Sequence, residues 1–195
     1  YYENGEIIKD ENFKAGKLDG KFTGWHENGQ KRIKGNYIAG EHTGTWISWD
    51  SLGVETSAAE WFEKGYNAGK NKKYNKAITF YLQTVELDPD YDIYKNLGNA
   101  YAGRGDLPNA IQSYEKAIEL TPDSADTYYS LGNVYTKQGD LPSAIWGYEK
   151  TIELDPEHVE AYYYLGIAYL NQGDSTKAVQ FLREGAKLGL KSDQE

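Results

Sequence analysis

The spacing of apolar residues changes partway along the chain. In the later part, apolar residues recur three and four positions apart in consecutive pairs of segments, as in Tyr94, Leu97 and Tyr101. This spacing puts apolar side chains on one face of a helix. In the earlier part, short stretches rich in aromatic and β-branched residues are separated by glycine-containing turns, which is typical of antiparallel strands. The pattern predicts an α+β chain, with a meander of β-hairpins over 1–56 and helical hairpins over 57–195.

The helical part repeats one arrangement of glycine, alanine and proline four times. We interpret these repeats as blocks of equal length without a gap, aligned on Gly65, Gly98, Gly132 and Gly166: 57–90, 91–124, 125–158 and 159–192. This period predicts a right-handed solenoid of four helical hairpins, in which each hairpin contacts only its neighbours. Because a solenoid offers an extended surface and no built-in catalytic centre, we expect it to bind another protein.

Residues with special backbone roles mark the ends of the expected helices. In the later blocks, a glycine in the left-handed conformation ends the first helix and an aspartate caps the second: Gly105-Asp106, Gly139-Asp140 and Gly173-Asp174. Each of the first three blocks closes with a proline, which stops its second helix. Ser57 and Glu60 have the spacing of a capping box, so we expect the first helix to start near residue 58. The last should end near Leu188.

A second, shorter period runs through residues 1–56. Asn4-Gly5 recurs 24 positions later as Asn28-Gly29, with aromatic residues nearby. Asn-Gly favours the type I′ hairpin turn, which needs positive φ at both central residues, so we predict type I′ turns at both places. The expected strands cover approximately 6–13, 21–27, 30–37 and 43–49. Because so few residues separate the last strand from the first helix, we also expect the two parts to pack against each other.

The helical blocks resemble the tetratricopeptide repeat. The two middle blocks carry its columns of aromatic, leucine, glycine, alanine and proline residues: Tyr94, Leu97, Gly98, Tyr101, Ala110, Tyr114, Ala117 and Pro122, then Tyr128, Leu131, Gly132, Tyr135, Ala144, Tyr148, Thr151 and Pro156. The first block departs from the pattern at Glu60, Lys64 and Ala68, and the fourth has Leu190 in place of proline. We expect the small residues to permit close helix packing and most of the tyrosines to pack between helices.

Residues 1–56 resemble the bacterial variant of the MORN repeat. The matching elements are Glu3-Asn4-Gly5, Gly16 to Gly20 and Phe22, then Glu27-Asn28-Gly29, Gly40 to Gly44 and Trp46. The resemblance implies binding rather than catalysis. A lipid role is proposed for some MORN proteins, but this segment has seven basic residues against nine acidic ones, which argues against a polybasic membrane lipid site. An unpaired edge of this sheet would accept a further strand.

The balance of charge limits the partners. Acidic residues outnumber basic ones by 30 to 21, and beyond residue 56 by 21 to 14. This excess argues against nucleic acid as a partner and favours a protein or peptide that is basic or neutral. No apolar run approaches the roughly 18 residues that span a bilayer, so we expect a soluble protein of a bacterial cytoplasm or periplasm. The absence of methionine and the start within a repeat suggest a fragment of a longer protein.

Residues suited to catalysis or metal binding are scarce. The chain has no cysteine, which excludes disulfides and thiolate metal sites. Its histidines, His26, His42 and His158, lack the spacing of metal ligands, so we interpret them as surface or turn residues. The glycines around Arg104 form a helix turn and not a phosphate-binding loop. We therefore predict a non-catalytic protein without a cofactor or metal.

The resemblance to tetratricopeptide repeats implies a binding face. In such arrays the first helix of each hairpin lines a concave groove, into which columns two, five and nine of each block point. The predicted peptide-binding residues are Asp92, Lys95, Asn99, Asp126, Tyr129, Asn133, Glu160 and Tyr163, with Trp61, Tyr66 and Ile167 in the same columns. The amides of Asn99 and Asn133 suit the backbone of an extended peptide. That these polar residues only solvate the groove is an equally weighted alternative.

Other functions were weighed against a peptide-binding adaptor. Chaperone-binding members of the family hold acidic C-termini in a carboxylate clamp, but its basic positions fall at Glu160 and Tyr164, so the charge argues against it. Self-assembly, through the open strand edge or the last helix, is the main alternative. That helix should expose apolar residues such as Val179, Leu182 and Leu188. A regulatory fragment of a larger protein is a third interpretation.

Overall fold

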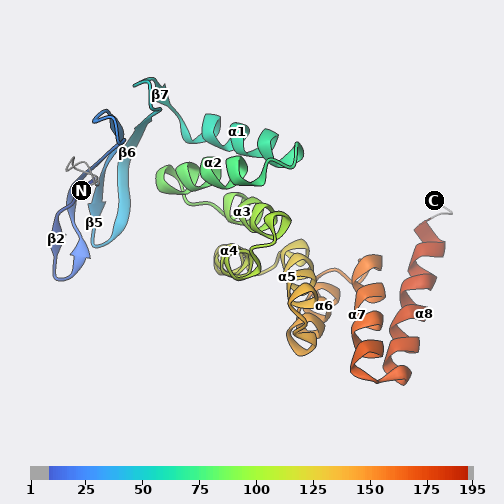
Figure 1. Cartoon of the computed structure of the whole chain (residues 1–195). Coiled ribbons are helices and arrows are strands. Elements are labelled where there is room, and N and C mark those ends of the chain that lie inside the picture. The colour runs from blue at the N-terminus through green and yellow to red at the C-terminus, as the bar shows by residue number, and fades with distance from the viewer. Residues whose placement is uncertain (1–8, 193–195) are drawn as a thin grey trace. The chain divides into compact units, whose positions relative to one another are not determined.

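The computed structural model describes residues 9–192, in which strands precede antiparallel pairs of helices (Figure 1). The strands are β1 (Lys9–Asp10), β2 (Phe13–Lys14), β3 (Lys17–Leu18), β4 (Gly20–Trp25), β5 (Lys31–Ile38), β6 (Glu41–Trp49) and β7 (Glu55–Thr56). The helices are α1 (Ala58–Lys70), α2 (Tyr74–Leu87), α3 (Tyr91–Arg104), α4 (Leu107–Leu120), α5 (Ala125–Gln138), α6 (Leu141–Leu154), α7 (Val159–Gln172) and α8 (Ser175–Ser192). The predicted fold class, an antiparallel β region followed by four helical hairpins, is confirmed.

The described chain forms two compact units. One comprises residues 9–64 with 83–88, and the other comprises residues 65–82 with 89–192. In the first unit, Trp61 of α1 is only 8% exposed, and its indole N–H donates to the hydroxyl of Ser48 at 3.1 Å. The guanidinium of Arg32 in β5 forms an ion pair with Glu86 of α2. The first unit therefore crosses the boundary at residue 56 that the repeats suggest.

The sheet of the first unit is an antiparallel meander. Its strand order is β1-β4-β5-β6-β7, and β2 and β3 form a separate two-stranded ribbon. In the antiparallel ladders, Phe22 lies opposite Gly35, and Asn36 lies opposite Thr43. Phe22 and Ile33 are buried on this sheet. The outer strand β7 has two residues, which leaves little edge for a further strand on that side.

The turn at Asn28-Gly29 forms where predicted but has a different geometry. Only Gly29 has positive φ, at 77°. The N–H of His26 donates to the carbonyl of Gln30 at 2.8 Å, and the N–H of Gly29 donates to the carbonyl of His26 at 3.0 Å. This is a three-residue loop closed by a left-handed glycine, so the prediction of a type I′ turn is wrong. The same bonds recur one period later over Asp50–Val54.

Turns with two positive φ values occur instead at Ala-Gly pairs. Ala15 and Gly16 have φ of 50° and 78°, and Ala39 and Gly40 have φ of 55° and 94°. The first pair joins β2 to β3 and the second joins β5 to β6. The two kinds of turn therefore alternate along the chain with the shorter period of the sequence. The predicted turn at Asn4-Gly5 and the start of the first predicted strand lie outside the described residues.

The helix ends follow the predicted caps. The aspartates of the three Gly-Asp turns accept hydrogen bonds from backbone N–H groups three positions later, and their glycines have positive φ. Ser57 and Glu60 form the two reciprocal bonds of a capping box, at 2.9 and 3.2 Å, so α1 begins at Ala58 as predicted. The last helix runs on to Ser192, beyond the predicted end at Leu188.

The first hairpin is one residue shorter than the predicted alignment. A Cβ on Gly98 would lie 2.6 Å from the ring of Tyr114, and one on Gly65 would lie 2.7 Å from the ring of Tyr81. Gly65 and Gly98 are therefore structurally equivalent. The interval between them in the sequence is one residue shorter than the interval between Gly98 and Gly132. Trp61 therefore falls in the aromatic packing column, which explains its burial and corrects its predicted place in the groove.

Candidate functional site

The eight predicted binding residues lie on the first helices of three hairpins in the second unit. Helix α3 carries Asp92, Lys95 and Asn99, α5 carries Asp126, Tyr129 and Asn133, and α7 carries Glu160 and Tyr163. Lys95, Tyr129 and Asn133 are half-buried, and the other five are exposed. Tyr163 is 52% exposed, which is high for a large aromatic side chain. Equivalent positions on successive hairpins thus present polar and aromatic groups to solvent.

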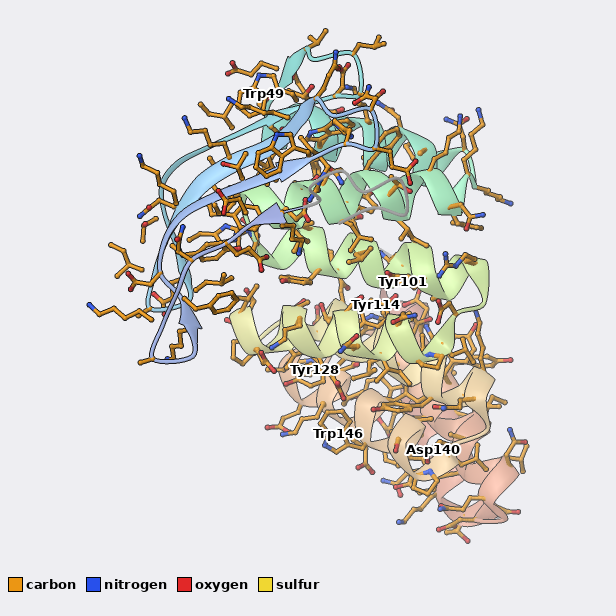
Figure 2. The ribbon with its side chains drawn as sticks, turned by 60° about the vertical axis from the view of Figure 1, so that its left-hand side comes forward. Trp49, Tyr101, Tyr114, Tyr128, Asp140 and Trp146 are labelled. Carbon is orange, nitrogen blue, oxygen red and sulfur yellow. The ribbon has the colours of Figure 1, made fainter. Side chains whose placement is uncertain are left out.

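The asparagines of this face are fixed by buried tyrosines of the adjacent helices. The hydroxyl of Tyr114 donates to Oδ1 of Asn99 at 2.6 Å, and the hydroxyl of Tyr148 donates to Oδ1 of Asn133 at 2.9 Å (Figure 2 labels Tyr114). Burial raises the pKa of Tyr148 to about 12, so its hydroxyl stays a donor at neutral pH. Each amide oxygen is therefore engaged, and the amide nitrogen is the group suited to donate to a peptide carbonyl.

The charged residues of this face include one local ion pair. Nζ of Lys95 lies 3.5 Å from Oδ1 of Asp92. The side chains of Asp92 and Glu160 are 64% and 68% exposed, against 27% for Lys95. An exposed ion pair of this kind contributes between zero and about 1 kcal/mol to the stability of the folded protein. It leaves the acidic groups accessible, so the face remains negative.

An aromatic cluster between α5 and α7 extends the predicted site. The ring of Tyr129 lies 4.7 Å from that of His158 and 6.0 Å from that of Tyr164, and Tyr163 lies 5.2 Å from Tyr164. Tyr164 is 38% exposed. Nδ1 of His158 accepts the N–H of Ala161 at 3.2 Å and so caps α7. Tyr164 and His158 are not among the predicted binding residues, although the run of three tyrosines on α7 was a signal for Tyr164.

A small pocket continues the face toward the first hairpin. It has a volume of about 190 Å³ and contains Asn99 with Asn96 of α3, and Tyr66 of α1. In the corrected register, Tyr66 is the counterpart of Asn99. The ammonium of Lys70 lies 5.5 Å from the centroid of the Tyr66 ring, within the range of a cation–π contact. The first hairpin thus adds an aromatic group where the next two hairpins have asparagine.

The interpretation of the histidines as surface residues is wrong for His42. Its ring stacks on Trp46 at 4.0 Å, and its Nε2 lies 3.1 Å from the hydroxyl of Tyr37. His26 is also partly buried, with Nε2 2.9 Å from the carbonyl of Trp49. In the part of the chain that the structure describes, no three histidine or acidic residues are grouped to hold a metal ion. Over the same residues, no helix has the length and apolar character to cross a membrane.

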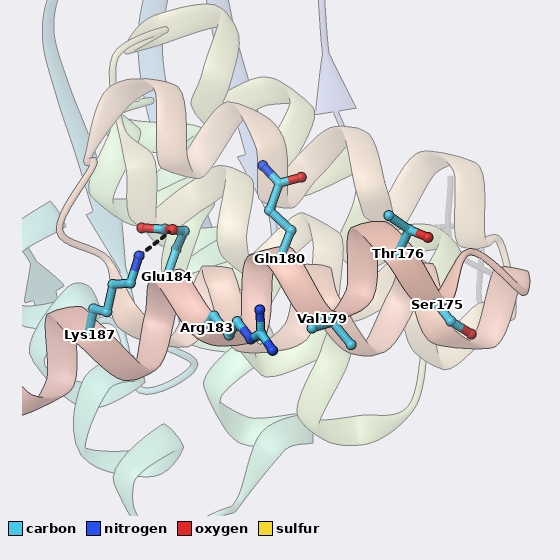
Figure 3. Close-up of a pocket in the computed structure, with 7 residues that line it drawn as sticks. All are labelled: Ser175, Thr176, Val179, Gln180, Arg183, Glu184 and Lys187. Atoms are coloured by element: carbon cyan, nitrogen blue, oxygen red, sulfur yellow. Dashed lines mark hydrogen bonds and ion pairs between the residues drawn. The ribbon is translucent and has the colours of Figure 1, made fainter.

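The exposed face of α8 is more polar than predicted (Figure 3). A shallow pocket of about 550 Å³ runs along it, lined by Ser175, Thr176, Val179, Gln180, Arg183, Glu184 and Lys187. Val179 is 47% exposed, as expected. Leu182 instead packs over Gly166 and is half-buried, so the predicted apolar surface at this end is smaller than expected.

Comparison with protein families identifies the helical part. One family model, described as TPR repeat, matches residues 98–139 and 132–173, and another, described as Tetratricopeptide repeat, matches residues 61–91 and 159–188. The chain belongs to the tetratricopeptide repeat family. The matched residues lie beyond the sheet, so the resemblance of residues 1–56 to MORN repeats stays a prediction.

Two known proteins are similar in sequence to part of this chain. The chain is 41% identical to the mitochondrial import receptor subunit TOM70 of Saccharomyces cerevisiae over 61 residues, which are 31% of this chain and 10% of that protein. It is 37% identical to Hsp70-Hsp90 organizing protein 3 of Arabidopsis thaliana over 68 residues, 34% of this chain and 12% of that protein. It therefore spans about a tenth of the length of these relatives.

Solved structures confirm the helical fold. The crystal structure of MamA superposes with a TM-score of 0.69 at 30% identity, covering 71% of this chain and 81% of that one. YrrB, described as a TPR protein with an unusual peptide-binding site, superposes with a TM-score of 0.62 at 19% identity, covering 71% and 75%. The fold and the relatives together support a role in protein interaction.

Proposed function

We propose that this protein is a non-catalytic adaptor that holds an extended or helical segment of a partner on the face formed by α3, α5 and α7. The observation that carries the proposal is the repeated pair of asparagines, Asn99 and Asn133. Each is held by a buried tyrosine hydroxyl in the same way on successive hairpins. Fixed amides lose little conformational entropy on binding, which favours recognition of a peptide backbone.

The chemistry of the same face favours a basic or neutral segment. The carboxylates of Asp92, Asp126 and Glu160 attract lysine and arginine. Exposed tyrosines beside them, such as Tyr163, offer ring faces for apolar or cationic side chains. The accessible carboxylate of Glu160 also continues to argue against a clamp for an acidic C-terminus.

The names of two relatives support an interaction role. One is an import receptor subunit and the other an organizing protein for two chaperones. The helical part of this chain consists of tetratricopeptide repeats, and it is the part that we propose to bind. We further propose that residues 1–56 are a MORN-like domain and residues 57–195 the interaction domain. Self-association is the alternative, and a mass that rises with concentration in light scattering would support it.

The test is an affinity capture from bacterial lysate with a variant that changes the groove and keeps its packing. Replacing Asn99 and Asn133 by alanine would remove one hydrogen bond from each of the buried hydroxyls of Tyr114 and Tyr148, which costs about 1 kcal/mol of stability for each. Asn99→Asp/Asn133→Asp retains the acceptor oxygen and removes the donors. A control with the same charge change outside the groove is Gln112→Glu/Gln138→Glu, at two exposed amides.

The proposal expects partners that bind the wild type and the glutamine control but are lost from the folded asparagine variant. Mass spectrometry identifies them, and far-ultraviolet circular dichroism checks folding. Equal retention by all three proteins would mean that the asparagines take no part in binding, and the proposed site would be wrong.

A further inference from the structure

The turn of the first hairpin has the geometry of the other turns but the opposite charge. The N–H groups of Lys72 and Lys73 donate to the carbonyls of Gly69 and Ala68, at 2.8 and 2.9 Å. Gly105 and Asp106 make the same two bonds in the second hairpin. Lys72 therefore occupies the left-handed position of the glycine, with φ of 55°, and Lys73 occupies the position of the capping aspartate. A cation stands where the other hairpins have a carboxylate.

This turn forms a pocket with the end of α3. The pocket has a volume of about 400 Å³, and its lining includes the cations of Lys72, Lys73, Lys76 and Arg104. Tyr74 lies against Gly103 so closely that a Cβ on the glycine would be 2.4 Å from its ring. This contact joins the two turns and brings the four cations around one depression of the surface.

Most of this positive charge lacks a local counterion. Arg104 pairs with Asp106 at 2.5 Å and donates to the side-chain oxygen of Asn75 at 3.3 Å. Over residues 9–192, no carboxylate lies within 4.0 Å of the ammonium groups of the three lysines. Four other lysines on the helices do have such carboxylates, Lys95, Lys116, Lys150 and Lys187, so what distinguishes the pocket is that three such lysines lie together. The cluster is thus a basic site on a chain whose net charge is −9.

We propose that this pocket binds an acidic segment of a partner protein, with several aspartate or glutamate side chains among the four cations. Three ammonium groups and a guanidinium are hydrogen-bond donors that match carboxylates in charge and geometry. The site adjoins the small pocket that continues the groove face, since Tyr74 lines both, but it takes a ligand of the opposite charge. Because the lysines are exposed, binding weakens as salt increases.

Fluorescence anisotropy with a labelled synthetic peptide of alternating glutamate and serine tests this proposal. Its neutral match replaces each glutamate with glutamine. The decisive variant is Lys73→Asp, which reverses one charge and also restores the aspartate cap of the other turns, so its thermal stability should not fall. The control is Lys137→Asp, an equal charge change at an exposed lysine in the last turn of α5.

The wild type should bind the glutamate peptide at low salt and bind the glutamine peptide at least tenfold more weakly. Lys73→Asp should weaken binding about tenfold, while Lys137→Asp stays within about twofold of wild type. Equal losses in both variants would overturn the proposal, as would equal binding of the two peptides. Competition by inorganic phosphate at the same concentration as the peptide would show a general anion site and also overturn it. Asn99→Asp/Asn133→Asp should still bind the peptide, which separates this test from that of the groove.

Discussion

The two repeating regions of this protein use glycine for different purposes. In the helical repeats, Gly98 and Gly132 have no unusual backbone, but the ring of a tyrosine sixteen positions later occupies the space of a Cβ. In the β repeats, Gly16 has positive φ and nothing within 4 Å of its absent Cβ. Gly35 is the exception, since it lies beneath Trp46. A repeated glycine therefore reveals the period of a fold but not whether packing or backbone geometry requires it.

The largest effect is expected at the packing glycine of the sheet. In Gly35→Ala, the new Cβ would lie 2.2 Å from the ring of Trp46. That ring is also held by Phe22 at 5.6 Å and His42 at 4.0 Å, so it has little room to move. The substitution should lower the free energy of unfolding by about 3 kcal/mol, measured by chemical denaturation. Gly35→Ala/Trp46→Val should recover part of the loss, and a fully additive double variant would contradict the contact.

A matched pair of glycines tests the same idea in the helices. Gly98→Ala places a Cβ 2.6 Å from the ring of Tyr114. It should lower the free energy of unfolding by about 2 kcal/mol. Gly69 is also helical, but its nearest neighbour is 3.9 Å away, so Gly69→Ala should stabilise the chain by up to about 1 kcal/mol. Thermal denaturation of both variants checks the signs. If both substitutions stabilised the chain, helix propensity and not packing would decide these positions.

The capping aspartates should have a smaller effect. The side chain of Asp140 accepts the N–H of Ser143 at 3.2 Å and caps α6. Asp140→Ala should therefore cost about 1 kcal/mol in the free energy of unfolding. Asp123→Ala, at an exposed residue of the loop between hairpins, is the control and should change stability by less than about 0.5 kcal/mol. Equal losses in the two variants would show that the hydrogen bond at the cap is unimportant.

The smallest expected effect is the contribution of His42, in the β region, to the pH dependence of stability. Burial lowers the pKa of His42 from its ordinary value of 6.5, while the negative charges of Glu86 and Asp88 act in the opposite direction. The folded state therefore binds fewer protons at this residue than the unfolded state does. Its contribution to stability is complete above pH 6.5 and is lost as pH falls through the lowered pKa. Denaturation midpoints measured from pH 7.5 to 5 should fall less steeply in His42→Phe than in wild type, and equal slopes would contradict this role.

The sequence predicted local features well because local chemistry determines them. The helix caps at Ser57, Asp106 and Asp140 depend on residues three positions away, so their geometry followed from spacing. The one-residue offset of the first hairpin was missed because the lengths of the repeats were assumed equal. The contact of Gly65 with Tyr81 shows the true register, and the shorter interval between Gly65 and Gly98 agrees with it.

Features that depend on distant contacts were predicted less well. The burial of Trp61 and of His42 results from contacts with strand residues, and no local pattern indicates them. Asn28-Gly29 is a turn by its sequence, but the register between β4 and β5 determines which kind of turn forms. For the candidate site, the repeat period predicted which helices carry the binding residues and which positions of each repeat they occupy. The tyrosine hydroxyls that fix Asn99 and Asn133 come from the neighbouring helix, so these hydrogen bonds could be identified only in the structure.

The most direct test of the proposed binding face is site-specific photo-crosslinking. A benzophenone-bearing amino acid in place of Tyr163 on α7 probes the face, and the same group in place of Trp146 on α6 is the control. The two side chains are similarly exposed, at 52% and 44%, but lie on the first and second helices of their hairpins (Figure 2 labels Trp146). If α3, α5 and α7 form the binding face, a partner captured from lysate should crosslink to position 163 and not to position 146. Crosslinking at 146 alone would contradict it.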